Sequence, residues 1–402
     1  MKRRSFSWIV IVALVVVAVF VARTCRAQER KVDPRITVRG GFALTIANAE
    51  LDKPRFLAFG PDGTLYVSLP GAGQIKALRD EDGDGYYEAM STFVDGHRSA
   101  HGMQWHGDEL WFTTSGAIHR AADVDGDHKA DRVVTVLDGL PSGGHWWRSI
   151  LIHKGRLYTS IGDSGNTTDE TDTDRQKIWS YDLEGGEKKL FIAGIRNTEK
   201  LVLRPGTDEI WGMDHGSDWF GRPLGETRQQ QPVTDYHPPD EMNHYRAGGF
   251  YGHPFIVGAK LPRYEYIERL SEKKIVDLAD RTVVPEWQMP AHSACNAMCF
   301  YAPPENAGRA FPDAYNGDAF VTMHGSWNRS SKSGYGLARV LFDDGKPYGM
   351  LTYVDFLDGQ RQLGRPVDVI VAPDGSLLFS DDGGDRIYRL RYVGDGATDA
   401  AR

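Results

Sequence analysis

A hairpin pattern that recurs six times along the chain constrains the fold more than any other feature. Each copy has an apolar strand, a Gly/Asp or Pro-Asp-Gly turn, and a second strand that ends near polar residues. Such turns supply the positive φ angles that tight β-hairpins require. A further strand follows, as in GQIKALR and DRIYRLRY. Three to four strands per repeated unit predict an all-β, six-bladed β-propeller. The hairpins lie at residues 54–70, 101–115, 147–163, 201–216, 295–303 with 317–325, and 365–384.

The repeat is clearest between two neighbouring units. Asp82 and Asp125, like Gly96 and Gly139, occupy equivalent offsets after the first and second hairpins. Elsewhere the repeat is degenerate, so the count of six depends on the hairpins, and five or seven blades stay open as alternatives. We assign residues 35–395 to a single propeller domain.

Two stretches depart from the hairpin pattern. Residues 264–280 have helical periodicity and predict a short amphipathic insertion. Residues 219–262 form the longest irregular stretch and are rich in Gly, Pro, Gln and His. Because loops of this length in a compact domain are usually functional or disordered, we expect an active-site loop here.

The N-terminus has the pattern of an export segment. Three basic residues at positions 2–4 precede an apolar run at residues 8–22, and a weak cleavage site ends at Ala27. The run is short for a membrane span, which needs about 20 apolar residues. We predict that residues 1–27 are a cleaved signal peptide, with a retained membrane anchor through residues 8–22 as the alternative. Both interpretations predict a periplasmic or secreted protein.

Charge, motifs and cysteine content exclude several classes of protein. The net charge is -8, and no Lys/Arg stripe with aromatics occurs beyond the N-terminus, so we expect no nucleic-acid binding. The sequence has neither a P-loop nor a Gly-x-Ser-x-Gly elbow. Cys295 and Cys299 are four residues apart, about 13 Å along a strand, and could bridge only across a bend. We interpret them as small buried thiols, so the fold must be held by its core.

Two Asp-rich loops resemble calcium loops. Residues 80–88 and 123–131 alternate carboxylates at a spacing that suits hard cations, although neither has the closing Glu of an EF-hand at the right place. Both loops lie between predicted strands, where solvated turn carboxylates are an equal alternative. Any metal bound there would be structural.

Polar and charged residues gather where the hairpins end. His145 lies eighteen residues before Asp163, with a hairpin between them, so the acid could orient the base. A loop-stabilising hydrogen bond would explain the same spacing, and both interpretations stay open. In a propeller these ends can converge on one mouth of the central channel, where Arg would pair with carboxylates and Trp would stack on a flat ligand. The group comprises His145, Asp163, Arg196, Asn197, Asp214, His215, Asp218, His292, His324, Trp327, Asn328, Arg329 and Arg365.

Most of the chain after the N-terminal segment resembles the pyrroloquinoline quinone (PQQ) dependent glucose and sorbosone dehydrogenases. The Arg-Asn and Gly-Ser-Trp-Asn-Arg motifs are similar to the sorbosone and fungal pyranose dehydrogenase branch. The resemblance implies six blades with the cofactor over the channel mouth. It rests on the segments GGHWWRSILIHKGRLYTSIGDSGN, AGIRNTEKLVLRPGTDEIWGMDHGSDWFG, PPDEMN, GGFYGHP, PAHSACNAMCFY, FVTMHGSWNRSSKSGYGLARV and LGRPVDVIVAPDGSLLFSDDGGDRIYRLRY, in that order.

The resemblance also implies roles for individual residues. His145 would take the proton from the substrate hydroxyl, and Asp163 would hold its ring. Arg196, with Asn197 beside it, would meet the quinone oxygens and stabilise the charge that develops there. Calcium would be held by the backbone carbonyls of Gly216 and Ser217, and would polarise the quinone. The remaining predicted cofactor contacts are His324, Trp327, Asn328, Arg329 and Arg365, the last of which would pair with a cofactor carboxylate.

One departure from the family bears on the substrate. Soluble glucose dehydrogenases have an acidic residue just before the base, and this chain has Gly144 there. The segment from His324 to Arg329 also replaces the lysine that those enzymes direct at the cofactor. Glucose is therefore a doubtful substrate.

The predicted function is PQQ- and calcium-dependent oxidation of a CH-OH group. The substrate would be an aldose, a sorbosone-like or related hydroxy or aldehyde sugar, or a polyol. Electrons would pass to an external acceptor such as a quinone or a cytochrome. Two alternatives stay open: a calcium-dependent, lactonase-like propeller hydrolase, and a non-catalytic propeller that binds a glycan or a protein.

Overall fold

The computed structural model of the chain describes residues 31–220 and 233–394. The predicted signal peptide or anchor at residues 1–27, with its apolar run at 8–22, lies outside the described residues. Among the residues that are described, no helix is long and apolar enough to cross a membrane.

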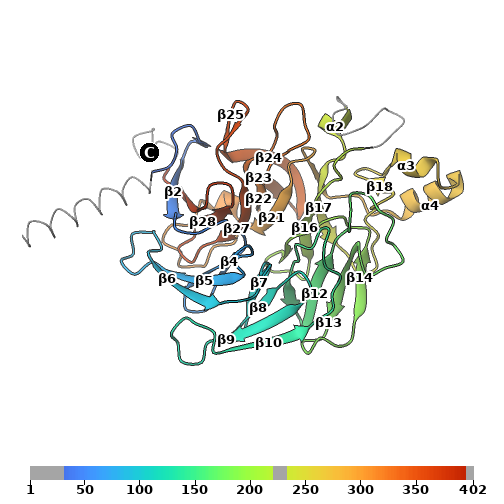
Figure 1. Cartoon of the computed structure of the whole chain (residues 1–402). Helices are drawn as coiled ribbons and strands as arrows, with labels where there is room; N and C mark the ends of the chain where they lie inside the picture. The colour runs from blue at the N-terminus through green and yellow to red at the C-terminus, as the bar shows by residue number, and fades with distance from the viewer. Residues whose placement is uncertain (1–30, 221–232, 395–402) are drawn as a thin grey trace, which may run out of the picture.

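Six antiparallel sheets of four or five strands form the blades in the described part of the chain and confirm the predicted all-β, six-bladed propeller (Figure 1). Each of the six predicted hairpins forms the first two strands of one blade. The contacts of neighbouring first strands, including β27 with β3, close the ring. The Gly and Asp turns therefore mark the blades, as the sequence pattern predicts.

The strands of each blade are given in order from the first strand outward. Blade one has β3 (Leu57–Phe59), β4 (Leu65–Leu69), β5 (Gln74–Arg79) and β6 (Ala89–Val94), and blade two has β7 (Met103–His106), β8 (Glu109–Thr113), β9 (Ile118–Ala122) and β10 (Arg132–Leu137). Blade three has β11 (Leu151–His153), β12 (Arg156–Ile161), β13 (Lys177–Tyr181) and β14 (Lys189–Ala193), and blade four has β15 (Leu201–Leu203), β16 (Ile210–Asp214), β17 (Asp240–Tyr245) and β20 (Trp287–Met289). Blade five has β21 (Cys295–Phe300), β22 (Ala319–Met323), β23 (Gly336–Asp343) and β24 (Lys346–Asp355), and blade six has β27 (Pro366–Val371), β28 (Leu377–Asp381), β29 (Arg386–Tyr392) and β2 (Phe42–Asn48).

The N-terminal strand β2 closes the ring as the outermost strand of blade six. It pairs antiparallel with β29, with Phe42 opposite Tyr392 and Leu44 opposite Leu390. Figure 1 shows this blue strand beside the red β28. A further short strand, β1 (Thr37–Val38), pairs with β24 of blade five. The two ends of the described chain are thus held together by backbone hydrogen bonds.

The second strands of the blades are the most deeply buried. Every residue of β4, β16, β22 and β28 is buried, because each strand packs against the neighbouring blades on both faces. Such strands have apolar runs such as LYVSL and AFVTM instead of strict alternation. Cys295 and Cys299 are buried free thiols on β21, as predicted.

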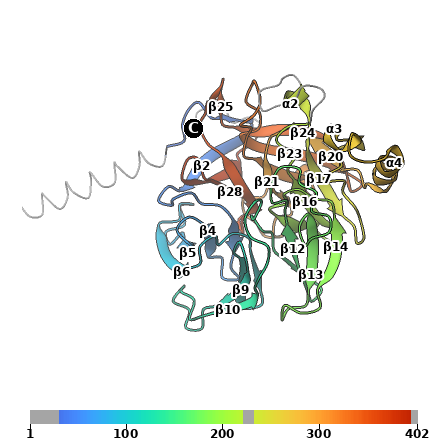
Figure 2. The ribbon, with the colours of Figure 1, turned by 45° about the vertical axis from the view of Figure 1, so that its right-hand side comes forward.

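The helical insertion is confirmed, and it comprises two helices. These are α3 (Tyr264–Ile267) and α4 (Glu272–Arg281), and the side chain of Ser271 caps α4 by accepting a hydrogen bond from the backbone N–H of Lys274. Both views place them at the periphery, far from blade one (Figures 1 and 2), and Figure 1 shows them beside the short hairpin of β18 (Ile256–Val257) and β19 (Leu261–Pro262). The remaining elements are α2 (Val233–Tyr236), a 3-10 helix (Asp313–Tyr315), β25 (Leu357–Asp358) and β26 (Arg361–Gln362).

The prediction of one long active-site loop at residues 219–262 is wrong in part. β17, the third strand of blade four, lies inside this stretch. Its sequence, DEMNHY, has few apolar residues, and the carboxylates of Asp240 and Glu241 accept the N–H groups of Gly216 and Gly258 in neighbouring loops. Residues 221–232 of the predicted loop lie outside the described part of the chain.

Strand direction divides the loops between two ends of the propeller. Loops between second and third strands, and links from one blade to the next, lie at one end, because neighbouring strands run antiparallel. Loops between first and second or third and fourth strands lie at the other. We call these the His145 end and the Asp80 end, after a residue in each.

Candidate active site

The predicted site residues lie at the His145 end. His145 precedes β11 in the link between blades two and three, and Arg196 and Asn197 lie in the next link, after β14. Asp163 follows β12 at the same end. The antiparallel order therefore brings the predicted group to one end, and the Asp-rich loops fall at the opposite end. The others at this end are Asp214, His215, Gly216, Ser217, Asp218, His292, His324, Trp327, Asn328, Arg329 and Arg365.

The imidazole of His145 is held by a backbone carbonyl. Its Nδ1 lies 3.0 Å from the carbonyl oxygen of Asp163, which also accepts the backbone N–H of His145 at 2.9 Å. A carbonyl can only accept, so Nδ1 carries the proton and the lone pair lies on Nε2. Burial, and then the nearby Arg196 cation, lower the pKa of His145 to about 3. The ring is therefore neutral near pH 7 and can accept a proton at Nε2.

The prediction that the carboxylate of Asp163 holds the ring of His145 is corrected by this geometry. That carboxylate is fully buried and accepts from His253 Nε2 at 2.7 Å, Gln176 Nε2 at 3.1 Å and the Gly165 N–H at 2.6 Å. Burial alone would raise the pKa of Asp163, but these donors, above all His253, hold it well below its usual value. Sequence reasoning missed His253, which lies ninety residues away in GGFYGHP.

The backbone of Asp163 links the two central residues of the site. Its N–H donates to the carbonyl of Arg196 at 2.9 Å, while its own carbonyl binds His145. Gly162 permits this approach, because a Cβ there would lie 2.7 Å from the Arg196 carbonyl oxygen and 2.8 Å from the His145 Cβ. One residue therefore fixes His145 and Arg196 relative to each other.

Gly144 explains the missing acidic residue before the base. Its φ is +60°, and a Cβ at this position would lie 2.4 Å from the Cα of Ser164. The link between blades two and three, which contains Gly144, thus passes directly over the loop after β12. No side chain fits here without a shift of the backbone, so the chain cannot present a carboxylate at this point.

Asp214 clamps the backbone of the Arg196-Asn197 pair. Its buried carboxylate accepts the N–H of Arg196 at 2.9 Å and that of Asn197 at 2.8 Å. Burial raises the pKa of Asp214 to about 6. The guanidinium of Arg196 is held in turn by Asn166, by the Gly216 carbonyl at 3.0 Å and by Asp218 at 3.2 Å. Arg196 is thus a buried, fixed cation beside His145.

Gly216 and Ser217 lie against further backbone carbonyls. A Cβ at Gly216 would lie 2.5 Å from the carbonyl oxygen of Pro239 and 3.0 Å from that of Pro238. The Gly216 N–H is bound by Asp240 at 2.8 Å, and the Ser217 hydroxyl binds Arg263 and the Trp219 carbonyl. A cavity of about 20 Å³ is lined by Gly216, Ser217 and both prolines. It has room for one water or ion.

His324 and Arg365 belong to a chain of charges that sequence reasoning identified only in part. His324 Nε2 lies 2.7 Å from Asp382, and its Nδ1 lies 2.9 Å from the Arg365 guanidinium. Because both ring nitrogens are occupied, His324 orients Arg365 and cannot itself bind a cofactor through nitrogen. Asp382 also binds Arg55 at 2.8 Å.

The network of charged side chains continues from Arg55 to residues of other blades. The guanidinium of Arg55 binds Glu199 at 2.7 Å and lies over the ring of Trp147 at 4.1 Å. Trp147 in turn stacks on Trp146, with ring centroids 3.9 Å apart. The sequence signals for this group are the Pro54-Arg55 and Arg365-Pro366 pairs at the start of two hairpins, and Asp382 at the end of the second of these hairpins.

In the Trp327-Asn328-Arg329 segment, the side chains of Asn328 and Arg329 bind backbone carbonyls of the loops around the site. The Asn328 amide donates to the Asp218 carbonyl, and Arg329 donates to the Ala291 carbonyl at 3.1 Å. Trp327 is 59% exposed at this end. His292 Nε2 binds the carbonyls of Thr234 and His237 and therefore anchors α2. These contacts make Asn328, Arg329 and His292 loop supports, with Trp327 as the exposed ring.

Each of the two Asp-rich loops forms a cluster of three carboxylates at the Asp80 end. Asp80, Asp82 and Glu88 converge in one, and Asp123, Asp125 and Asp131 in the other. Loop N–H groups already bind these carboxylates, as Gly83 and Gly85 bind Asp80 at 2.8 and 2.9 Å. Asp123 accepts the N–H groups of Gly126 and His128 in the same way, so backbone N–H groups cap both turns.

The comparisons with known proteins agree with this fold. A protein of the Trichoderma reesei Carbohydrate-Active Enzymes Family AA12, solved with calcium, is 19% identical with a TM-score of 0.76, covering 89% of this chain and 97% of that one. The PQQ domain of Coprinopsis cinerea pyranose dehydrogenase is 17% identical with a TM-score of 0.74, covering 89% and 97%. The soluble aldose sugar dehydrogenase of Escherichia coli is 17% identical with a TM-score of 0.61, covering 87% and 99%. At these identities the likeness shows a shared fold.

Two sequence matches go further. An uncharacterized protein of Borreliella burgdorferi is 25% identical over 399 residues, which cover 94% of this chain and 96% of that protein. The family described as TrAA12-like matches residues 36–392, which span the whole propeller from just before β1 to the end of β29. The chain therefore belongs to the TrAA12-like family.

Proposed function

We propose that this protein is a PQQ- and calcium-dependent oxidoreductase that oxidises a CH-OH group of a sugar. The observation that carries the proposal is the neutral His145, whose Nδ1–H is held by the Asp163 carbonyl and whose Nε2 can accept a proton beside the buried Arg196. The AA12 and PQQ-domain structures, which share this fold, support the same class of chemistry.

The residues at the His145 end fit a polar, anionic cofactor. Buried polar atoms without a hydrogen-bond partner among the described residues include Asn166 Nδ2, Asn197 Oδ1 and Arg329 Nε. Such atoms cost free energy unless water or a ligand completes them. Arg365 can pair with a carboxylate, and Trp327 offers a stacking face. Asn197 and Arg365 would thus hold PQQ together with Arg196.

Calcium fits the backbone oxygens near Gly216 and Ser217. Carbonyl oxygens are ligands that Ca²⁺ prefers, and those of Pro239 and Pro238 lie 2.5 and 3.0 Å from the position of a Cβ on Gly216, beside a cavity of about 20 Å³ that Gly216 and Ser217 also line. The Gly216 carbonyl already accepts one hydrogen bond from Arg196, which leaves its second lone pair for a cation. Gly216 and Ser217 would therefore supply the protein ligands.

The chain's own residues would do three things in the reaction. His145 Nε2 would take the proton from the substrate hydroxyl, and the Asp163 carbonyl would stabilise the resulting imidazolium through Nδ1–H. Arg196, fixed by Asn166 and Asp218, would stabilise negative charge without reorganising. When bound, PQQ would supply the group that accepts hydride from the substrate carbon.

The substrate we propose is an aldose, a sorbosone-like sugar or a related hydroxy or aldehyde compound, with glucose disfavoured. The steric restriction at Gly144 removes the acidic neighbour that would contact a glucose hydroxyl in the soluble glucose dehydrogenases. An external quinone or cytochrome would accept the electrons. We further propose that the protein acts in the periplasm or outside the cell, because residues 1–27 have the pattern of an export segment.

The rival function, a calcium-dependent propeller hydrolase, needs side-chain ligands that converge on a channel metal. Glu199 and Asp382 are two carboxylates at the His145 end, and both are neutralised by the Arg55 guanidinium, at 2.7 and 2.8 Å. Within the described residues, the two groups of acids that could hold a metal both lie at the Asp80 end. The geometry therefore favours the oxidoreductase.

Reconstitution tests the proposal directly. Protein prepared without cofactor would be titrated with PQQ and calcium, with binding followed by fluorescence, and then screened against sugars with an artificial electron acceptor. We expect saturable PQQ binding that is weakened by calcium chelation, and dye reduction with at least one aldose or sorbosone-like sugar. Absence of PQQ binding at micromolar concentration would sink the proposal.

Two variants separate the roles of the residues. His145→Ala should lower kcat by about 10²- to 10⁴-fold, the usual contribution of a general base, with PQQ affinity nearly unchanged. Arg365→Ala should instead weaken PQQ binding. Lactone hydrolysis without PQQ would favour the hydrolase, and sugar binding unaffected by His145→Ala would favour the non-catalytic propeller.

A further inference from the structure

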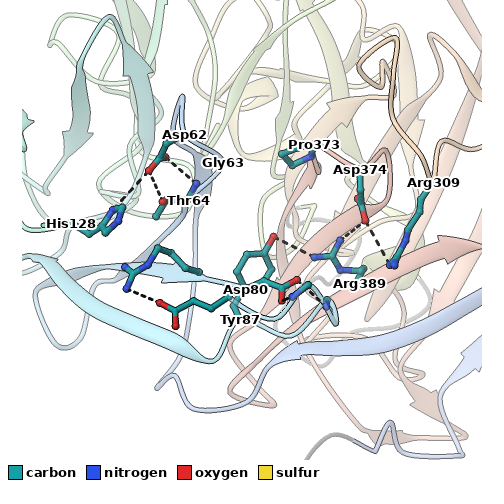
Figure 3. Close-up of a pocket in the computed structure, with 14 residues that line it drawn as sticks. Asp62, Gly63, Thr64, Asp80, Tyr87, His128, Arg309, Pro373, Asp374 and Arg389 are labelled. Atoms are coloured by element: carbon teal, nitrogen blue, oxygen red, sulfur yellow. Dashed lines mark hydrogen bonds and ion pairs between the residues drawn. The ribbon is translucent and has the colours of Figure 1, made fainter. Parts of the chain in front are cut away.

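A second polar cavity lies at the Asp80 end, opposite the candidate active site. Its volume is about 570 Å³, within the range of pockets that hold small molecules. It lies between the turn of blade one, the Asp-rich loop after β5, the His128 loop of blade two and β29 of blade six. Figure 3 shows Asp62, Thr64 and His128 on one side, with Arg309, Asp374 and Arg389 on the other.

Three of the four carboxylates of this cavity accept hydrogen bonds from the protein. Asp80 accepts the N–H groups of Gly83 and Gly85, one on each oxygen. Asp62 accepts the N–H and the hydroxyl of Thr64, and lies 3.8 Å from His128. Asp374 accepts from Ser376 on one oxygen and from Arg389 on the other. The fourth carboxylate, Glu81, is exposed. Asp62 and Asp80 thus accept one hydrogen bond on each oxygen from the protein, and the remaining lone pairs can accept from hydroxyl groups.

The guanidinium groups, by contrast, retain unused donors. Arg389 is 5% exposed, and its Nε has no partner; this atom faces Gly85 in the cavity wall, 3.6 Å from where a Cβ of Gly85 would lie. Arg79 Nη1 is also buried without a partner, and its Nη2 reaches Glu81 only at 3.5 Å. Arg309 is 42% exposed and lies 3.9 Å from Asp374. A buried charged donor without a partner costs more than a neutral one, so an acceptor belongs here.

Positive charge also accumulates around Asp374. Arg391 shares a face of β29 with Arg389, and its Nε is likewise buried without a partner. Burial, and then repulsion from Arg309 and Arg389, lower the pKa of Arg391. Three guanidiniums thus surround one carboxylate, an arrangement that a further anion would stabilise.

We propose that this cavity binds a small molecule with a carboxylate or phosphate group next to hydroxyl groups. The oxyanion would accept hydrogen bonds from Arg389 Nε, Arg79 and Arg309, which suit bidentate recognition of planar or tetrahedral oxyanions. The hydroxyls would face the Asp62 and Glu81 side of the cavity, where carboxylate oxygens can accept from them. Sugar acids and sugar phosphates share this chemistry.

Calorimetric titration of the cofactor-free full chain tests the proposal, so its outcome does not depend on the proposed redox function. Sodium phosphate, sodium D-glucuronate, D-glucose and calcium chloride would be titrated separately. We expect phosphate or glucuronate to bind and glucose not to bind. Tighter binding of glucuronate would identify a sugar acid as the natural class, and tighter binding of phosphate would identify a phosphorylated one.

Arginine variants locate the binding. Arg309→Ala and Arg79→Ala should each weaken oxyanion binding at least about tenfold, because each removes a charge-assisted hydrogen bond. Arg132→Ala is the matched control, since Arg132 is 61% exposed and pairs with one carboxylate, Glu109, on blade two. It should leave the affinity unchanged. Should Arg79→Ala fail to fold, Arg309→Glu reverses a charge on an exposed side chain and should abolish binding.

Three results would overturn the proposal. The first is no oxyanion binding at millimolar concentration. The second is equal affinity in the wild type and in the Arg79→Ala/Arg309→Ala double variant, which would place the binding elsewhere. The third is binding of calcium in place of oxyanions that is abolished by Asp80→Asn, which would make the cavity part of a cation site.

Discussion

The imidazole of His145 and the carboxylate of Asp163 belong to different hydrogen-bond systems, although the residues are joined by a backbone contact. The carbonyl of Asp163 sets the tautomer of His145, and its carboxylate is clamped by His253, Gln176 and Gly165. The carbonyl fixes the ring, while burial and then Arg196 lower the pKa of His145 by more than its hydrogen bond to this carbonyl raises it. The clamp keeps the carbonyl in place.

Histidine NMR tests this arrangement. In ¹⁵N-histidine-labelled protein, with His145→Gln used to assign the signal, we expect His145 to stay neutral and Nδ1-protonated from about pH 8 down to about pH 5, below the ordinary value of about 6.5. Asp163→Asn should preserve this tautomer, because the carbonyl remains. A midpoint near 6.5, or an Nε2–H tautomer, would contradict the structure.

The lowered pKa of His145 makes the free energy of unfolding depend on pH. The folded-state pKa of His145, about 3, lies below that of the unfolded chain. The unfolded state therefore binds more protons between these values, and the stabilisation from His145 is complete above about pH 6.5 and lost as pH falls. The difference in the free energy of unfolding between the wild type and His145→Gln should therefore shrink as the pH falls below about 6.5.

At the scale of elements, the links between blades are bound to the ends of second strands. Asp214, at the end of β16, binds the N–H groups of Arg196 and Asn197, and Asp381, at the end of β28, binds the N–H of Arg365 at 2.6 Å. The loop after β12 uses backbone contacts for the same purpose. These three links are thus each held by the second strand, or the loop after it, of the blade that they lead into.

Gly144 shows how tightly one link is packed. Gly144→Ala should destabilise the protein by about 1–3 kcal/mol more than Gly143→Ala, which is the typical cost of overpacking. Gly143 is the matched control: its φ is +78°, and no atom lies within 4 Å of the position that a Cβ would take. Both variants should incur the strain of positive φ. Urea unfolding measures the difference, and equal midpoints would show that the Ser164 loop can move aside.

At the scale of the whole molecule, the ring depends on a strand taken from the N-terminus. Phe42 of β2 packs edge-on against Phe311, Tyr353 and Tyr392, with ring centroids 5.0 to 5.3 Å apart. These rings come from blade five and blade six. The closure is therefore held by backbone pairing and by an aromatic cluster that spans two blades.

Phe42→Ala should open the ring at this closure. We expect a loss of about 3–5 kcal/mol, the usual cost for a buried Phe, and hydrogen exchange that accelerates first in β2 and β29. Phe112→Ala, at a fully buried position of blade two, should cost a similar amount and leave β2 and β29 protected. Exchange in β2 that is the same in both variants would show that closure is not the weak point.

The sequence by itself determined the propeller and the end at which the candidate site lies. Turn residues dictate hairpins locally, and antiparallel strand order then places His145, Arg196 and Arg365 at one end. Tertiary structure alone decided which atoms meet. The partner of Asp163 is His253, ninety residues away, and Arg55 joins Glu199 and Asp382 from other blades. Spacing cannot reveal such contacts, because they depend on how blades pack around the axis. It likewise cannot distinguish the carbonyl of Asp163 from its carboxylate, since both belong to one residue.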